Sequence, residues 1–185
     1  APAMPAGDKQ QNPPLNPAQT GSANPSETGR LGRAAVNMAL GEQVTEDLPM
    51  IAALAVADGL DSPALFELAG LSRRDPPADI RDLFVQAMAE LGRPVPGVSD
   101  AWWERMFDAA RGMLSGSLTH YEASNEIYWC ACHLERTDAA IELVDLFCGL
   151  WSNWEDWPDE RAAIEQDMRL AAADLLRSHG EQAPE

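Results

Sequence analysis

The sequence predicts an all-α fold, a compact multi-helix bundle of about seven or eight helices preceded by a disordered Pro-rich N-terminal arm. The 185 residues include 30 Ala and 20 Leu but only 5 Ile and 7 Val, which favours helices over sheets. Apolar residues recur at helical spacing between Gly, Pro and N-cap signals, and no stretch alternates with the period of a strand.

The charge and the polar composition divide the chain into two regions. Residues 1–29 are rich in Pro, Asn, Gln and Ser, and they cannot bury enough apolar surface to offset the entropy lost on ordering. We therefore predict a disordered arm or linker over 1–29 and a single acidic α-helical domain over 30–185. The whole chain has 13 Lys and Arg against 30 Asp and Glu, a net charge of −17.

In the first half, glycines and N-cap residues mark the ends of the expected helices. The clearest case runs from Asp75 as N-cap, with Pro76 at the first helical position, to Gly92. Thr45 and Asp61 are the expected N-caps of the two helices before it. The sequence thus predicts helices over 30–40, 45–58, 61–69 and 75–91.

In the second half, Thr119 and Glu122 match a capping box, and Thr137 is the expected N-cap of the next helix. The run from Ile127 to Cys132 is almost wholly apolar, which predicts a central helix buried on most sides. The expected helices cover 99–114, 119–136, 137–151 and 158–179. The side chains expected in the core include Ile80, Leu83, Phe84, Phe107, Val144 and Phe147.

The composition argues against several function classes. A strongly acidic chain lacks the basic face that neutralises phosphates, so we expect no direct nucleic-acid binding and no attraction to anionic lipid. No apolar run approaches the roughly 18–20 residues of a membrane-spanning helix. Three cysteines are an odd number for a disulfide framework, and the chain opens with no secretory leader, so we expect a cytoplasmic protein.

The candidate metal ligands are Cys130, Cys132, Cys148, His120 and His133. Zinc needs ligands that converge tetrahedrally, but on a helix Cys130 and Cys132 point about 200° apart. We therefore interpret the thiols as small buried hydrophobic groups and expect no metal and no cofactor.

Two catalytic arrangements are also conceivable on that helix. His133 could polarise Cys130 with Glu126 one turn further back, but a thiol in the middle of an apolar helix has a raised pKa. Glu122, Glu126 and His133 share one helix face, but the Glu-x-x-His pattern of di-iron bundles is absent. We assign no catalytic residue.

The segment from Trp151 to Glu160 carries three indoles spaced by three residues, with acidic residues between them. Indoles anchor many protein interfaces, and carboxylates around them suit the Arg and Lys side chains of a partner. We expect Trp151 to close the core. The predicted partner-binding residues are Trp154, Glu155, Asp156, Trp157, Asp159 and Glu160.

These observations predict a non-catalytic module that binds a basic protein partner, as an acidic inhibitor or immunity-type antagonist would. One alternative is a helical-bundle enzyme, a hydrolase or metal enzyme, that uses His120, His133 and nearby glutamates. Another is a regulatory subunit that docks through its N-terminal arm. The sequence does not define the oligomeric state or the identity of the partner.

Overall fold

The computed structural model describes the backbone of residues 25–179 and the side chains of residues 29–178, and these residues form no strand. This confirms the all-α prediction. The elements are α1 (Pro25–Ala39), the 3-10 helix η1 (Thr45–Asp47), α2 (Leu48–Ala57), α3 (Pro63–Gly70), α4 (Pro77–Glu90), α5 (Val98–Ser115), α6 (His120–His133), α7 (Asp138–Asp156), the 3-10 helix η2 (Pro158–Glu160) and α8 (Arg161–His179).

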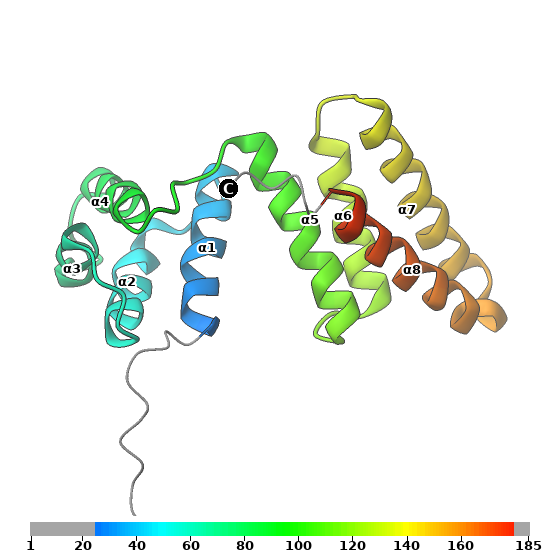
Figure 1. Cartoon of the computed structure of the whole chain (residues 1–185), viewed down its shortest axis with the longest axis horizontal. Helices are drawn as coiled ribbons and strands as arrows, with labels where there is room; N and C mark the ends of the chain where they lie inside the picture. Colours follow the sequence, from blue (N-terminus) through cyan, green and yellow to red (C-terminus); the bar gives the residue numbers. More distant parts are fainter. Residues whose placement is uncertain (1–24, 180–185) are drawn as a thin grey trace, which may run out of the picture.

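The helices form two groups, each with its own hydrophobic core. Helices α1–α4 lie at one end of the long axis and α5–α8 at the other (Figure 1). The first core draws its buried side chains from residues 31–88, and the second core draws them from residues 106–175. No residue belongs to both cores, so each group buries its own apolar surface.

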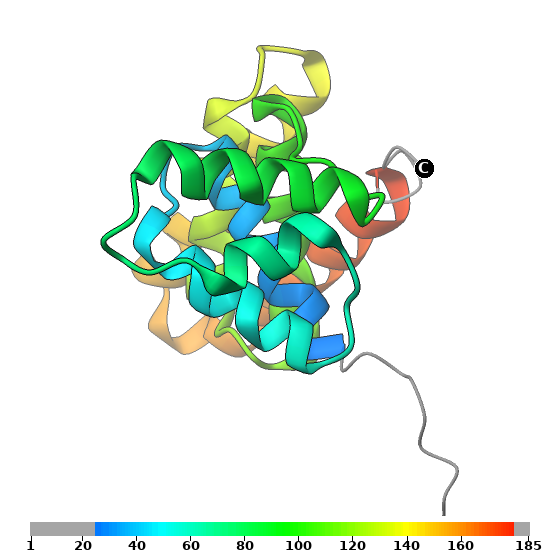
Figure 2. The same cartoon turned by 90° about the vertical axis from the view of Figure 1, so that its left-hand side faces the viewer.

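The first core is enclosed by short helices that cross one another (Figure 2). Phe84 of α4 is fully buried in it, together with Leu48, Leu65 and Leu68. Ile80 is also buried, as the sequence predicts, whereas Leu83 lies at the edge of this core and is only partly buried. The core prediction for α4 is thus confirmed at Ile80 and Phe84 and only partly at Leu83.

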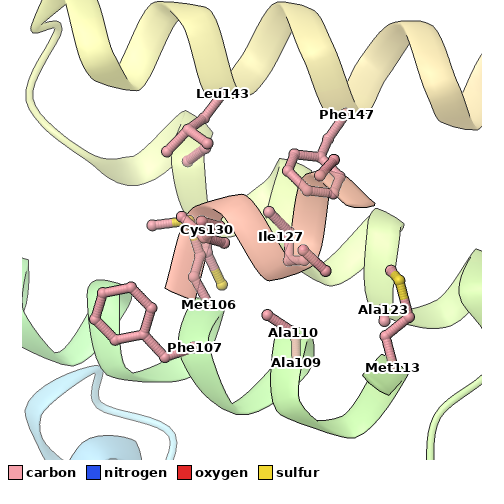
Figure 3. Packing of buried hydrophobic residues seen from close by; sticks show 14 of the residues in the cluster. Met106, Phe107, Ala109, Ala110, Met113, Ala123, Ile127, Cys130, Leu143 and Phe147 are labelled. Atoms are coloured by element: carbon pink, nitrogen blue, oxygen red, sulfur yellow. The ribbon is translucent and has the colours of Figure 1, made fainter. Parts of the chain in front are cut away.

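The second core lies between α5, α6, α7 and α8. Phe147 of α7, Ile127 and Cys130 of α6, and Met106 of α5 point into it (Figure 3). Phe147 is fully buried and Phe107 is 7% exposed, as expected from the sequence. Val144 packs against the edge of this core and is partly buried.

The two groups meet mainly where α1 packs on α5. Across this junction, Arg105 of α5 donates to Glu42 just after α1 at 2.5 Å, and within the second group it donates to Glu126 of α6 at 2.5 Å. The connecting segment is residues 91–97, in which Gly92 has a positive φ of 72° that favours glycine. The α1–α5 contact, the Arg105–Glu42 bond and the segment 91–97 therefore connect the two groups.

Two of the predicted N-caps are confirmed in the second group. Thr119 accepts a hydrogen bond from the Glu122 amide, and Glu122 accepts one from the Thr119 amide, which completes the capping box. Thr137 caps α7 by accepting from the Ala140 amide at 3.2 Å. Helix α6 ends at His133 rather than near Arg136.

The predicted caps of the first group are wrong in register. Helix α3 is capped by Ser62 rather than Asp61, because the Ser62 hydroxyl accepts from the Leu65 amide at 3.1 Å. Asp75 instead accepts hydrogen bonds from the amide and hydroxyl of Ser72, and Pro76 is the N-cap of α4. The stretch from Thr45 begins with η1, so α2 starts only at Leu48.

The first helix begins before the predicted boundary. Helix α1 starts at Pro25, so residues 25–29 of the expected arm are helical, and 30–40 is the later part of this helix. The rest of the predicted arm, residues 1–24, lies outside the described residues, as do residues 180–185 at the other end.

Two large apolar side chains, one on α3 and one on α6, are exposed. Phe66 of α3 is 50% exposed, and Trp129 of α6 is 53% exposed. Helix α6 packs on α5, α7 and α8, but its remaining face is open, and this face includes Trp129, Cys132 and His133. The prediction that this helix is buried on most sides is therefore correct where α6 faces α5, α7 and α8, and wrong for the face that includes Trp129.

Replacing the buried cap residue Ser62 with alanine is expected to destabilise the first group by about 1–2 kcal/mol. The Ser62 hydroxyl also donates to Glu90 at 2.5 Å, and Glu90 accepts the Ala64 amide at 3.0 Å. These bonds lower the pKa of Glu90, with the Ser62 bond the largest cause. Their stabilising effect is present above the ordinary glutamate pKa and is lost as pH falls through the lowered value.

Urea unfolding followed by far-ultraviolet circular dichroism, at neutral and acidic pH, tests this. The difference between wild type and Ser62→Ala should shrink as Glu90 is protonated. The exposed Ser72→Ala variant, whose partner is Asp75, is the control because it leaves α3 capped. Equal stability of Ser62→Ala and wild type at neutral pH would contradict the assignment.

Candidate functional site

The predicted partner-binding residues all lie within 154–160, the corner between α7 and α8, which we call the acidic corner. Helix α7 ends at Asp156, and Trp157 leaves helical geometry with φ −122° and ψ 75°. Pro158 then opens η2, which leads directly into α8. Because the backbone changes direction at Trp157, the indoles of Trp154 and Trp157 have different environments.

Trp154 belongs to the inside of this corner. Its indole packs against the second core, and its Nε1 donates to Glu165 Oε1 at 3.0 Å. The Arg161 guanidinium lies 3.9 Å from the centre of the indole ring, and Arg161 Nε donates to the Trp154 carbonyl at 3.1 Å. A cation of the same chain thus covers the indole, so Trp154 mainly stabilises the corner.

Trp157 has the opposite environment, with 57% of its surface exposed. Asp156, Asp159 and Glu160 beside it are exposed too, and none of the three forms a side-chain hydrogen bond or ion pair with a described residue. The structure therefore places an accessible indole among three unneutralised carboxylates.

Glu155 links the corner to the start of α6, since Tyr121 Oη donates to Glu155 Oε1 at 3.0 Å. The Tyr121 ring lies 5.1 Å from the Trp154 ring and 6.1 Å from the Trp151 ring, centre to centre. Trp151 is half-buried beside Tyr121 and Tyr128, and Trp154 rather than Trp151 packs against the second core, so the expected role of Trp151 is wrong. Tyr121 is a site residue that the sequence reasoning missed, because it lies 34 positions from Glu155.

The cysteine and histidine candidates do not converge. Cys130 is buried, and desolvation followed by the nearby Glu126 charge raises its pKa from 9.0 to about 12. His133 stacks on Trp102 with ring centres 4.4 Å apart, and its Nδ1 lies 2.7 Å from the Trp129 carbonyl oxygen. Within residues 29–178, no cluster of three or more His, Cys, Asp or Glu side chains could hold a metal ion.

His120 has a different partner from any that we expected. Its Nδ1 lies 3.7 Å from Glu165 Oε2, and its Nε2 is buried without a hydrogen-bond partner. Glu165 comes from α8 and also holds Trp154, so His120 borders the acidic corner rather than the cysteines. No motif in the sequence connects these positions.

The three thiols are expected to react with a disulfide reagent in the order Cys132, Cys148, Cys130, following exposed, half-buried and buried positions. Cys130 should react only after unfolding, because its raised pKa leaves almost no thiolate at neutral pH. The raised pKa also means that the unfolded state loses this proton first, so stability falls as pH rises from 9.0 toward about 12.

Mass spectrometry of the modified chain identifies each thiol, and the urea-unfolded protein provides the control with all three reactive. Rapid labelling of Cys130 in the folded protein would contradict its burial.

Within the part of the chain that the structure describes, no helix has the length and apolar character needed to span a membrane. Comparison with protein-family models, with curated proteins and with solved structures gives no match. The proposal of a function therefore depends on the chemistry of the surface.

Proposed function

We propose that the protein is a non-catalytic module that binds a basic protein partner, as an inhibitor or immunity-type antagonist does, with the acidic corner as its contact surface. The observation that supports this best is the exposed indole of Trp157 among Asp156, Asp159 and Glu160. An indole is costly to leave in water, and it is among the side chains that contribute most when buried at an interface.

The unneutralised carboxylates give the surface its preference for a cationic partner. At a helix start one or two acidic side chains interact favourably with the backbone, but three neighbouring carboxylates also repel one another. A cationic partner relieves this repulsion, and the net charge of −17 accelerates the encounter. If the partner acts on nucleic acid, the same carboxylates compete with phosphates for its basic surface.

Trp157, rather than Trp154, has the exposure that an anchor requires. Trp154 is already covered by Arg161 and bonded to Glu165, so its removal loosens the corner itself.

The free thiols suit a reducing compartment, and we propose the cytoplasm as the location.

Neutralising Asp156 and Asp159 together is expected to slow association with the partner about tenfold at low salt and to flatten its salt dependence. Trp157→Ala is expected mainly to speed dissociation, by about tenfold or more. The partner is sought by capturing cationic proteins from the source cell on the immobilised chain, and binding kinetics are then measured at two ionic strengths.

The matched control is the pair Asp79→Asn and Asp82→Asn on α4, which removes the same charge from exposed positions far along the chain. This control should change the association rate much less than the corner pair. The proposal fails if no cationic protein is retained, or if the corner variants bind it as wild type does.

A further inference from the structure

A groove of about 760 Å³ lies beside the acidic corner. One wall is the loop from Gly116 to Leu118 with the first turn of α6, and the other is formed by Trp154, Glu165 and Arg169. Tyr121 also lines it and donates to Glu155, so the groove borders the acidic corner.

Glu165 is held in a fixed position in this groove. One carboxylate oxygen accepts the Trp154 indole N–H at 3.0 Å, and the other lies 3.7 Å from His120 Nδ1. The side chain is still 35% exposed, so a ligand can reach the carboxylate. A carboxylate fixed in this way loses little conformational entropy when it binds a cation.

The arginines of α8 do not neutralise Glu165. Arg161 and Arg169 stand four residues before and after it, the spacing at which ion pairs form on a helix. Arg161 instead lies on the Trp154 ring, and Arg169 Nη1 is 3.5 Å from the Met113 carbonyl oxygen. No arginine among the described residues forms an ion pair with Glu165.

Two aromatic rings line the groove. Tyr121 stands beside Trp154 with ring centres 5.1 Å apart, and its hydroxyl donates to Glu155 of the acidic corner. A guanidinium is planar, bonds a carboxylate through two parallel N–H groups and stacks on aromatic rings. An ammonium is a compact, strongly hydrated charge without this planar match.

We propose that this groove receives one arginine side chain of the basic partner, with Glu165 as its counter-ion and Tyr121 as the ring beside it. This inference rests on the proposed function, since it names the chemical group that the contact surface recognises. The acidic corner then attracts the partner, and the groove fixes its orientation.

The test is a titration of the ¹⁵N-labelled full chain with a blocked Gly-Arg-Gly peptide, followed by the Trp154 indole N–H resonance. That resonance is assigned with Trp154→Phe among the six tryptophans. It should shift saturably, because its acceptor Glu165 gains a guanidinium. Two further peptides carry lysine or citrulline in place of the arginine. The lysine peptide should bind several-fold more weakly. The citrulline peptide, whose side chain has the shape of arginine but no charge, should give no saturable shift.

Glu165→Gln is the decisive variant, because its amide oxygen still accepts the Trp154 indole N–H while the charge is lost. Its thermal midpoint should stay close to that of wild type, and its affinity for the arginine peptide should fall about tenfold. Glu142→Gln, an exposed residue of α7, is the matched control and should bind as wild type does.

The inference is overturned if the citrulline peptide shifts the resonance as the arginine peptide does, or if Glu165→Gln binds unchanged. Its failure differs from that of the proposed function. A captured cationic protein that binds Glu165→Gln normally removes the groove assignment alone. An arginine peptide bound through Glu165, with no cationic protein ever captured, removes the proposed function alone.

Discussion

Phe147→Ala is expected to destabilise the second core by about 3–5 kcal/mol, a large part of the 5–15 kcal/mol typical of a folded domain. Phe147 is fully buried on α7, within a cluster to which α5, α6 and α8 also contribute. Removing its ring deletes apolar contacts and leaves a cavity that rigid helices cannot fill. Urea unfolding followed by tryptophan fluorescence measures the loss, because all six tryptophans lie between residues 102 and 157.

Phe66→Ala is the matched control, since it deletes the same ring from a position that is 50% exposed. Because α3 belongs to the first group, which contains no tryptophan, the stability of this variant is measured by far-ultraviolet circular dichroism. It should cost less than about 1 kcal/mol, in proportion to the smaller apolar area that leaves water. A Phe147→Ala loss as small as that of Phe66→Ala would show that the second core is packed differently.

Phe84→Ala is expected to cost a similar 3–5 kcal/mol, but in the first core. Phe84 is fully buried and shares no buried neighbour with Phe147, because the two cores have no residue in common. The first group contains neither tryptophan nor tyrosine between residues 29 and 97, so its unfolding is nearly silent in fluorescence. Far-ultraviolet circular dichroism reports both groups.

Phe84→Ala should therefore move the circular dichroism transition to lower urea while the fluorescence transition changes little. The double variant should lose the sum of the two single losses, as expected for distant sites. If Phe84→Ala moves both signals together, the α1–α5 contact and Arg105 couple the cores more strongly than their small interface suggests.

The sequence predicted helices well where the signal is local. The capping box of Thr119 and Glu122 needs only residues three apart, and it is present as expected. The cap of α3 was misplaced because Ser62 gains from Glu90, which is 28 residues away on α4. A long-range partner of this kind leaves no trace in the local pattern.

Burial was predicted less well, because helical spacing defines a face but not what covers it. Phe66 and Trp129 lie in apolar stretches, yet about half of each side chain is exposed. The division into two cores was not expected either, since each helix carries an apolar stripe whichever core it joins.

Within the candidate site, the residues of the corner were identified from sequence, but their roles depend on where α7 ends. Trp154 is on the last full turn and faces the core, whereas Trp157 follows the helix and turns outward. His120 and Glu165 are 45 positions apart, so only the packing of α6 on α8 brings them together.

The separation of the cores also has a consequence for biosynthesis. Every residue that forms the first core, down to its partly buried edge at Val95, precedes α5 in the chain. The nascent polypeptide thus completes one full set of core residues before any residue of the second core leaves the ribosome. Helices α1–α4 can collapse during translation without waiting for distant contacts, which shortens the time that their apolar faces are open to aggregation.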